Sequence, residues 1–207
     1  PAVLTTNFIT GNPDFEAIEA NDYSKYLDIP INADKALRFS WQNGIQRHVF
    51  YPQYHGRSHF WMENWLEDLR QDVPGARALF QERQNGGLAL LKNANWRYHS
   101  EYINWRTGKM RSVEALKSWV NTGLDYFKTA FGFRPKSTVA PHYILPKPVM
   151  SVLAKSGLCF VQGGNYHIMQ HPQTGSQMVN GHSLGEITSE GLLFLVRTVR
   201  FEPRPTR

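Results

Sequence analysis

Short apolar runs alternate with longer amphipathic stretches along most of the chain, and this alternation predicts an α/β fold. The clearest amphipathic stretch begins at Ser112 and ends at Gly132. A strand, a helix and a further strand in succession are typical of a mainly parallel sheet. The predicted strands lie at 1–9, 47–51, 137–140, 158–162 and 192–196. The apolar stripe of the long helix consists of Val113, Leu116, Val120, Leu124, Phe127 and Phe131.

Residues that begin or end helices indicate the other elements. Asp14 follows turn residues and is placed to cap a short helix. Apolar residues four apart, from Trp61 through Trp65 to Leu69, predict a helix that follows His59. We expect further helices at 34–43, 74–83 and 148–155, an irregular insertion at 88–107, and a loop from 164 to 191.

Length and composition fit a single domain over residues 1–207, with 41% hydrophobic residues for a packed core. No apolar run approaches the roughly 20 residues that a membrane span needs, so we expect no membrane span. No signal peptide is recognisable at the start, and a cytoplasmic location is favoured. The single Cys159 lies in an apolar run and is predicted to be a buried core thiol.

The charge of the chain bears on its partners. It carries 23 basic and 17 acidic residues, a net charge of +6, but the two signs are mixed and form no long basic stripe. We therefore expect no nucleic-acid partner. An anionic glycan or a nucleotide-linked sugar is at least as compatible with this charge.

Two histidines, His55 and His59, lie four residues apart just after the predicted strand at 47–51. On a first helical turn their rings would face the same way, beyond the carboxyl end of a strand, where α/β folds gather their chemistry. Neutral imidazoles bind zinc and related divalent metals, and two of them need at least one further ligand. The alternative is a chance pair of surface histidines. His167 and His171 have the same spacing but are expected in a loop, so spacing alone does not decide.

Two later segments add to this pattern. Residues 133–143 contain a strand that ends in a proline and an aromatic residue, and residues 153–161 contain a helix, a glycine and a strand. Together with His55 and His59, which match a His-x-x-x-His motif, they resemble the polysaccharide deacetylase family of carbohydrate esterases. A bacterial subgroup of deacetylase-like proteins is closer still. The segments similar to that subgroup are 12–15, 52–57, 160–163 and 197–203.

The resemblance implies a partial, distorted (β/α) barrel with a mainly parallel sheet and one divalent metal, with zinc the expected ion. It implies that His55 and His59 are metal ligands. The candidate substrate-binding residues are Gln53, Arg57, Pro141, His142 and Tyr143. Arg57 is suited either to clamp a carboxylate, phosphate or sugar hydroxyl or to form a surface ion pair. Gln53 is suited to orient a ligand histidine or the backbone, and His142 to line the pocket, to serve the structure or to act as a third ligand.

The departures from the family also matter. Its paired aspartates would precede the strand that begins at Pro1, and its late histidine, the general acid, would follow Arg207. The arginine usual in the proline motif is missing, because Thr138 or Val139 occupies its place. We therefore expect a fragment of a larger barrel with a two-histidine half-site, which binds a divalent metal weakly or not at all and carries no catalytic residue of its own.

Three functions remain open from the sequence. The first is a metal-dependent, deacetylase-like hydrolase that acts on acetylated glycans or sugars and is incomplete in these residues. The second is a non-catalytic glycan-binding or assembly protein with a degenerate deacetylase-like barrel. The third is a structural α/β domain with accidental histidines. Uncovered strand edges would also favour a homo-oligomer.

Overall fold

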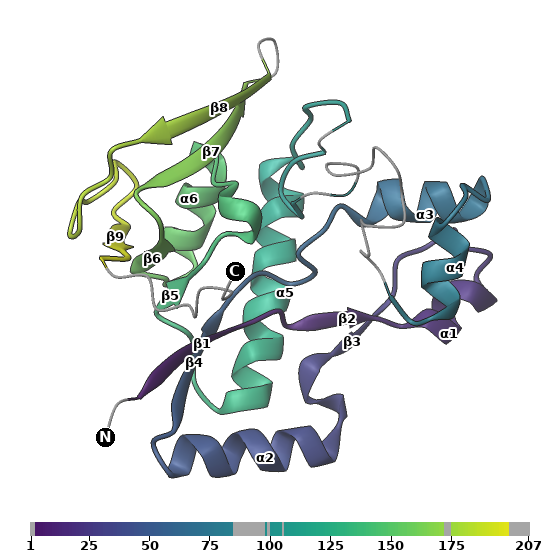
Figure 1. The fold of residues 1–207 in the computed structure, drawn as a ribbon, viewed down its shortest axis with the longest axis horizontal. Coiled ribbons are helices and arrows are strands. Elements are labelled where there is room, and N and C mark those ends of the chain that lie inside the picture. Colours follow the sequence, from purple (N-terminus) through teal and green to yellow (C-terminus); the bar gives the residue numbers. More distant parts are fainter. Residues whose placement is uncertain (1–2, 85–97, 99, 105, 172–174, 199–207) are drawn as a thin grey trace, which may run out of the picture.

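The computed structural model describes residues 3–84, 98, 100–104, 106–171 and 175–198. Its centre is a five-stranded sheet with the order β1-β4-β5-β6-β9, in which every neighbouring pair is parallel (Figure 1). The predicted α/β fold with a mainly parallel sheet is confirmed. The strands of this sheet are β1 (Leu4–Phe8), β4 (Phe50–Tyr54), β5 (Ser137–Thr138), β6 (Phe160–Gly163) and β9 (Leu193–Val196).

Two antiparallel strand pairs flank the sheet. β2 (Gly11–Pro13) pairs with β3 (Asp28–Pro30), and β7 (Tyr166–His171) pairs with β8 (Gly175–Asn180). The β7–β8 hairpin lies where a loop was predicted, and that prediction was wrong. Six residue pairs satisfy the backbone of this hairpin through its own ladder, so it forms without the long apolar runs on which the prediction relied.

Side chains cap the N-termini of some of the helices. Ser112 Oγ accepts a hydrogen bond from the Ala115 amide, and Gly132 closes the same helix with a φ of 83°. The Asp14 carboxylate accepts from the Ala17 amide, as predicted. The helices are α1 (Phe15–Ala20), α2 (Lys35–Gln46), α3 (Met62–Arg70), α4 (Ala76–Gln81), α5 (Val113–Phe131) and α6 (Lys147–Lys155), with 3₁₀ turns at Ile31–Ala33 and Pro141–Tyr143.

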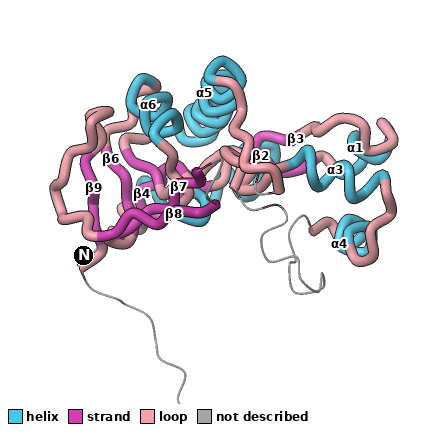
Figure 2. Tube along the Cα trace, turned by 90° about the horizontal axis from the view of Figure 1, so that it is seen from above, coloured by secondary structure: helices cyan, strands magenta, loops and turns pink. Residues whose placement is uncertain are grey.

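The buried side chains form two clusters. In the first, α5 and α6 pack on one side of the sheet, with Leu124 and Phe127 of α5 fully buried (Figure 2). In the second, Trp65, Leu69 and Phe80 join α1, α3 and α4. We call these parts the sheet lobe (the five-stranded sheet, α5 and α6) and the helical lobe (α1, α3 and α4). The figures show them side by side.

Two details correct the expectations from sequence. Cys159 is exposed: it lies in the turn between α6 and β6, outside the strand itself, and the neighbouring Leu158 is buried in the core instead. Val113, the first residue of α5, is 56% exposed rather than part of the buried stripe. None of the helices within the described residues is long and apolar enough to span a bilayer.

Candidate functional site

The segment that carries His55 and His59 is a loop, not a helical turn. The His55 amide donates to the Phe8 carbonyl at 2.8 Å, so His55 directly continues the pairing of β4 with β1. Gly56 and His59 then take left-handed φ values of 89° and 68°, and α3 begins only at Met62. The predicted helical geometry of the pair was therefore wrong. The ring centroids of His55 and His59 nevertheless lie only 4.8 Å apart.

A buried carboxylate holds this loop in place. Glu101 is fully buried, and its two oxygens accept hydrogen bonds from the backbone amides of Arg57, Ser58 and His59 at 2.6–3.1 Å. Gly56 is required beside it, since a Cβ there would lie 2.5 Å from Glu101 Oε1. Glu101 thus fixes the backbone on which His59 stands.

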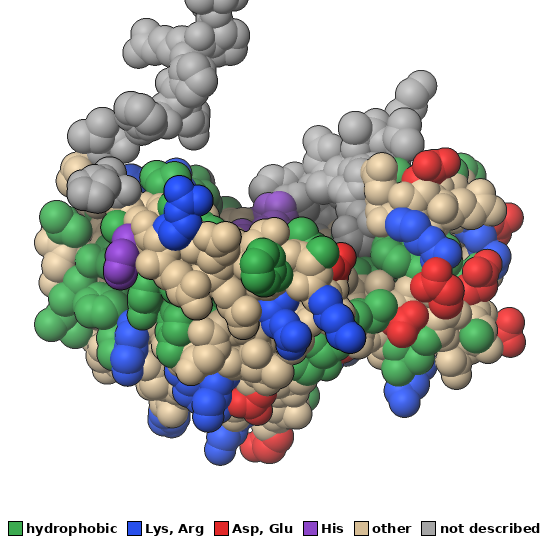
Figure 3. Space-filling view, turned by 90° about the horizontal axis from the view of Figure 1, so that it is seen from below, with side chains coloured by type: hydrophobic (Ala, Val, Ile, Leu, Met, Phe, Trp, Pro, Cys, Tyr) green, Lys and Arg blue, Asp and Glu red, His purple; other side chains and the backbone are tan. Residues whose placement is uncertain are grey.

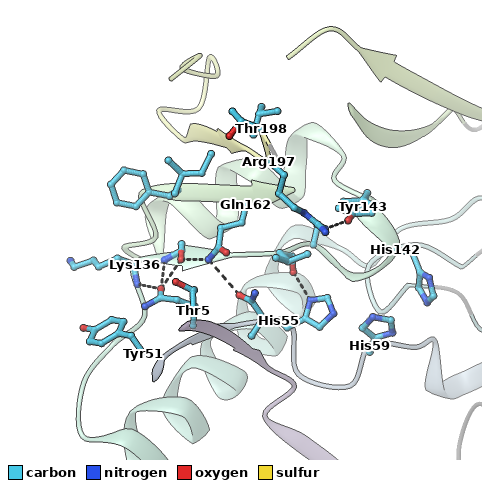
Figure 4. A pocket seen from close by; sticks show the side chains of 18 residues that line it. Thr5, Tyr51, His55, His59, Lys136, His142, Tyr143, Gln162, Arg197 and Thr198 are labelled. Carbon is cyan, nitrogen blue, oxygen red and sulfur yellow. Dashed lines mark hydrogen bonds between the residues drawn. The ribbon is translucent and has the colours of Figure 1, made fainter. Parts of the chain in front are cut away.

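A third imidazole joins the pair from another strand. β5 ends at Thr138, and the turn after it places His142, with a φ of 53°, so that its ring centroid is 4.4 Å from that of His59. Figure 4 shows His55, His59 and His142 at one end of a cavity. This is the carboxyl end of the parallel strands, where the sequence predicts that the three histidines meet.

The tautomer of His55 follows from its partner. Its Nδ1 lies 2.8 Å from the Val139 carbonyl oxygen. A carbonyl can only accept, so in the neutral ring Nδ1 carries the hydrogen and Nε2 carries the lone pair. This is the arrangement in which a backbone carbonyl orients a metal-ligating histidine.

The cavity that contains these histidines has a volume of about 940 Å³ and runs along the face of the sheet opposite α5 and α6. Alternation along the strands brings Tyr51, Gln53 and His55 of the β4 segment to this face, while Tyr54 points to the helices. The lining residues are Thr5, Asn7, Tyr51, Gln53, His55, His59, Lys136, Ser137, Val139, Ala140, His142, Tyr143, Phe160, Gln162, Leu195, Val196, Arg197 and Thr198.

Amide and hydroxyl groups form a connected network on the floor of the cavity. Gln53 Oε1 accepts from the Ser137 amide at 2.7 Å and from Ser137 Oγ at 2.8 Å. Gln162 Nε2 in turn donates to Ser137 Oγ at 2.6 Å and to Asn7 Oδ1 at 3.4 Å. Neighbouring strands are therefore joined by side chains as well as by their ladders, and the network presents neutral polar groups to a ligand.

The structure separates the predicted substrate-binding residues into two groups. Gln53, His142 and Tyr143 line the cavity, and Gln53 does so while it anchors the backbone of β5. Arg57 is not among the lining residues. Its guanidinium makes a bidentate pair with Asp28 at 2.7 and 2.8 Å and lies over the Trp119 ring. It therefore forms contacts within the protein instead of facing the cavity. Pro141 is also absent from the lining and is buried.

Several residues of the site were not predicted from the sequence. Asn7, Ser137 and Gln162 lie at alternate positions of predicted strands, so the period of the strands could have indicated that they share a face. Arg197 enters directly after β9, where the sequence showed only part of a basic tail. Glu101 lies in the stretch expected to be irregular, and no local signal marks a carboxylate that binds a loop more than 40 residues away.

The described residues contain no group of three or more His, Cys, Asp or Glu side chains arranged to hold a metal ion. His55 and His59 lie next to each other, and His142 contacts His59 in turn. The donor chemistry of His55 and His59 fits a divalent metal that receives its remaining ligands from elsewhere.

The chain was compared with known proteins. No protein-family model matches it, and no curated protein matches it.

A second histidine cluster lies outside the cavity. His167 Nδ1 is 2.7 Å from His182 Nε2, and His182 Nδ1 is 2.9 Å from Glu186 Oε1. Burial, and to a lesser extent the neighbouring His182, lower the pKa of His167 to about 4. The side chain of His171, which has the same spacing to His167 as His59 has to His55, lies outside the described part, and the described partner of His167 is His182.

Proposed function

We propose that this protein is a deacetylase-like barrel protein that acts on acetylated glycans or sugars, with His55 and His59 as two ligands of a divalent metal, zinc being the expected ion. The observation that carries the proposal is the hydrogen bond from His55 Nδ1 to the Val139 carbonyl. It leaves the lone pair of Nε2 available within contact distance of a second imidazole, at the mouth of a cavity large enough for a sugar chain. Five parallel strands in chain order are compatible with part of a barrel.

The residues of the chain have separate tasks in this proposal. Glu101 and the Val139 carbonyl hold His59 and His55 in place, while Gln162, Asn7 and Ser137 offer hydrogen bonds to sugar hydroxyls. A divalent metal, when bound, supplies Lewis acidity to an acetyl carbonyl and to water. The described lining of the cavity contains no carboxylate, so a carboxylate base would come from another part of the protein.

The same lack of a carboxylate in the described lining favours a second candidate function. A cavity floored by amides and hydroxyls and flanked by Tyr51, Tyr143 and Phe160 has the chemistry of a carbohydrate-binding site without a reaction. In that case the protein would bind a glycan non-catalytically through a degenerate barrel.

Coupling between metal and glycan distinguishes the two functions. We expect the 207-residue chain to bind zinc weakly, and zinc to raise its affinity for an N-acetylated chito-oligosaccharide but not for the deacetylated sugar, because only the acetyl group would contact the metal. Titration calorimetry with and without zinc measures this. Release of acetate from the chain alone should be negligible, since the described cavity lining offers no carboxylate to serve as the base.

The substitutions must be compatible with the left-handed backbone conformation at residue 59. His55→Ala combined with His59→Asn removes both ligands, and Asn tolerates the left-handed conformation at residue 59. His48→Asn is the matched control, because His48 is exposed and also left-handed at φ 54°. Zinc-independent glycan binding would support the second candidate, and zinc binding that survives the double substitution would exclude His55 and His59 as ligands. Metal-dependent turnover lost in the double variant would show that the chain carries a complete site.

A further inference from the structure

The charges around the cavity are all of one sign. Among its lining residues, Lys136 and Arg197 carry a full positive charge, and none is Asp or Glu. No ion pair joins Lys136 or Arg197 to a carboxylate among the described residues. A concave site lined by charges of one sign concentrates its field and attracts ligands of the opposite sign.

Arg197 is positioned at the end of the cavity that also holds the histidines. Its amide donates to the Gly163 carbonyl at 2.8 Å, which extends the pairing of β9 with β6 by one residue. Its guanidinium Nη2 donates to the hydroxyl of Tyr143, and Figure 4 shows the two side chains meeting close to His142 and His59. Tyr143 therefore holds the guanidinium over the cavity through one nitrogen, which leaves its other N–H groups for a ligand.

The second cation lies at the other end. In Figure 4, Lys136 and Tyr51 are at the end opposite the histidines, with Gln162 between the two ends. A ligand that contacts both cations must therefore extend along the sheet, as an oligosaccharide does. The acidic side chains visible in Figure 3 gather mostly on the helical lobe, away from the face of the sheet lobe, where basic side chains predominate.

We propose that the cavity selects an anionic glycan, with a carboxylate or phosphate of the sugar bound by Arg197 beside the histidine cluster. This inference rests on the proposed function, because it names the substrate class of the same cavity. A guanidinium recognises carboxylate and phosphate through paired, charge-assisted hydrogen bonds, which a neutral sugar hydroxyl cannot match. Lys136 adds a second, more distant contact for the negative charge of a longer chain.

The test compares sugars that differ in charge. Calorimetry on the full chain uses a tetrasaccharide of alternating N-acetylglucosamine and glucuronate against neutral N-acetyl-chitotetraose, and N-acetylglucosamine 6-phosphate against N-acetylglucosamine. We expect the better anionic sugar to bind about 10-fold to 100-fold more tightly than its neutral counterpart at low salt. The advantage should shrink as salt rises. Which anionic sugar gains more identifies carboxylate or phosphate as the preferred group.

A set of variants distinguishes a specific role of Arg197 from a general effect of positive charge. Arg197→Gln should abolish the preference for the anionic sugar, and Arg197→Lys should retain part of it. Arg134→Gln is the matched control, because Arg134 is exposed, pairs with Asp125 at 2.6 Å and does not line the cavity. Lys136→Gln should weaken the binding of the anionic tetrasaccharide but not that of the monosaccharide phosphate. Thermal unfolding of each variant shows that it remains folded.

Three results would overturn the inference. Equal affinity for anionic and neutral sugars would remove it while leaving the proposed function intact. Equal losses in Arg197→Gln and Arg134→Gln would show a non-specific effect of charge and would exclude Arg197 as the binding group. Failure of every sugar to bind would instead overturn the proposed function, and this inference with it.

Discussion

Glu101 is the residue on which the geometry of the histidine loop depends. Its carboxylate accepts hydrogen bonds from three successive backbone amides, and it is fully buried. Glu101→Gln keeps the shape but turns an NH₂ group toward those donors, so that buried amides lose their acceptor. We expect a loss of about 1–3 kcal/mol in the free energy of unfolding, measured by urea denaturation.

The control for this prediction is Glu63→Gln. Glu63 is about half exposed and pairs with Arg111 at 2.6 Å, so its substitution should cost less than about 1 kcal/mol. If both variants lose the same small amount, Glu101 does not hold the loop. Zinc affinity provides a second measurement, because a displaced His59 should weaken it about 10-fold to 100-fold.

The lowered pKa of His167 predicts how the stability of the fold depends on pH. Its pKa falls from 6.5 to about 4 in the folded protein, mainly through burial. The unfolded chain therefore takes up the proton first as the pH falls, and the folded state loses stability between about pH 6.5 and pH 4. The contribution amounts to roughly 2 kcal/mol by pH 4.5. His182, Glu186 and Glu190 are the titratable groups that act on it.

The measurement is urea unfolding at pH 7 and pH 4.5. His167→Gln removes the titrating ring, so its stability should fall less over this interval than that of the unsubstituted protein. His48→Asn should behave as the unsubstituted protein does, because His48 is exposed. An identical pH slope for all three proteins would contradict the assignment to His167.

At the scale of elements, the packing of α5 on β4 depends on one glycine. A Cβ at Gly123 would lie 2.5 Å from the Tyr54 hydroxyl and 3.1 Å from Arg57 Cβ. Alanine favours a helix by about 1 kcal/mol over glycine, but overpacking costs typically 1–3 kcal/mol. We expect Gly123→Ala to destabilise the protein by roughly 1 kcal/mol. Ser118→Ala, at an exposed position of the same helix, should change stability by less than about 0.5 kcal/mol. A stabilised Gly123→Ala would show that α5 can move away from the sheet.

Elements with strong local signals were predictable from sequence. The period of α5, its Ser112 cap and its Gly132 stop depend only on nearby residues, and all are confirmed. β4 was expected at 47–51 but spans Phe50–Tyr54, because its extent is set by pairing with β1 rather than by apolar character. The β7–β8 hairpin was missed for the same reason.

The site was predictable only in part. The meeting of His55, His59 and His142 followed from their places after parallel strands. The pairing of Arg57 with Asp28 could not be predicted, because Asp28 lies in a different segment and no spacing rule connects the two residues. Contacts of this kind depend on how α5 packs against the β2–β3 strand pair. The hydrophobic period of the sequence carries no information about that packing.

At the scale of the whole molecule, β1 is an edge of the sheet among the described strands. It exposes 64% of Leu4, and no charged residue interrupts the strand. An uncovered apolar edge favours pairing with another chain. We expect self-association at high micromolar concentration, measured by sedimentation, that Leu4→Lys weakens. Val113→Lys, at a 56% exposed position at the start of α5, should leave it unchanged. A monomer at all concentrations would contradict this prediction.

The position of α5 has a consequence for how the two lobes fold. Its Trp119 belongs to the apolar cluster of the helical lobe, whereas Leu116, Val120 and Leu124 belong to that of the sheet lobe. One continuous helix therefore supplies side chains to both cores, and melting it would expose both at once. We therefore expect the two lobes to unfold together, so that a destabilising substitution in the helical lobe also lowers the stability of the histidine site.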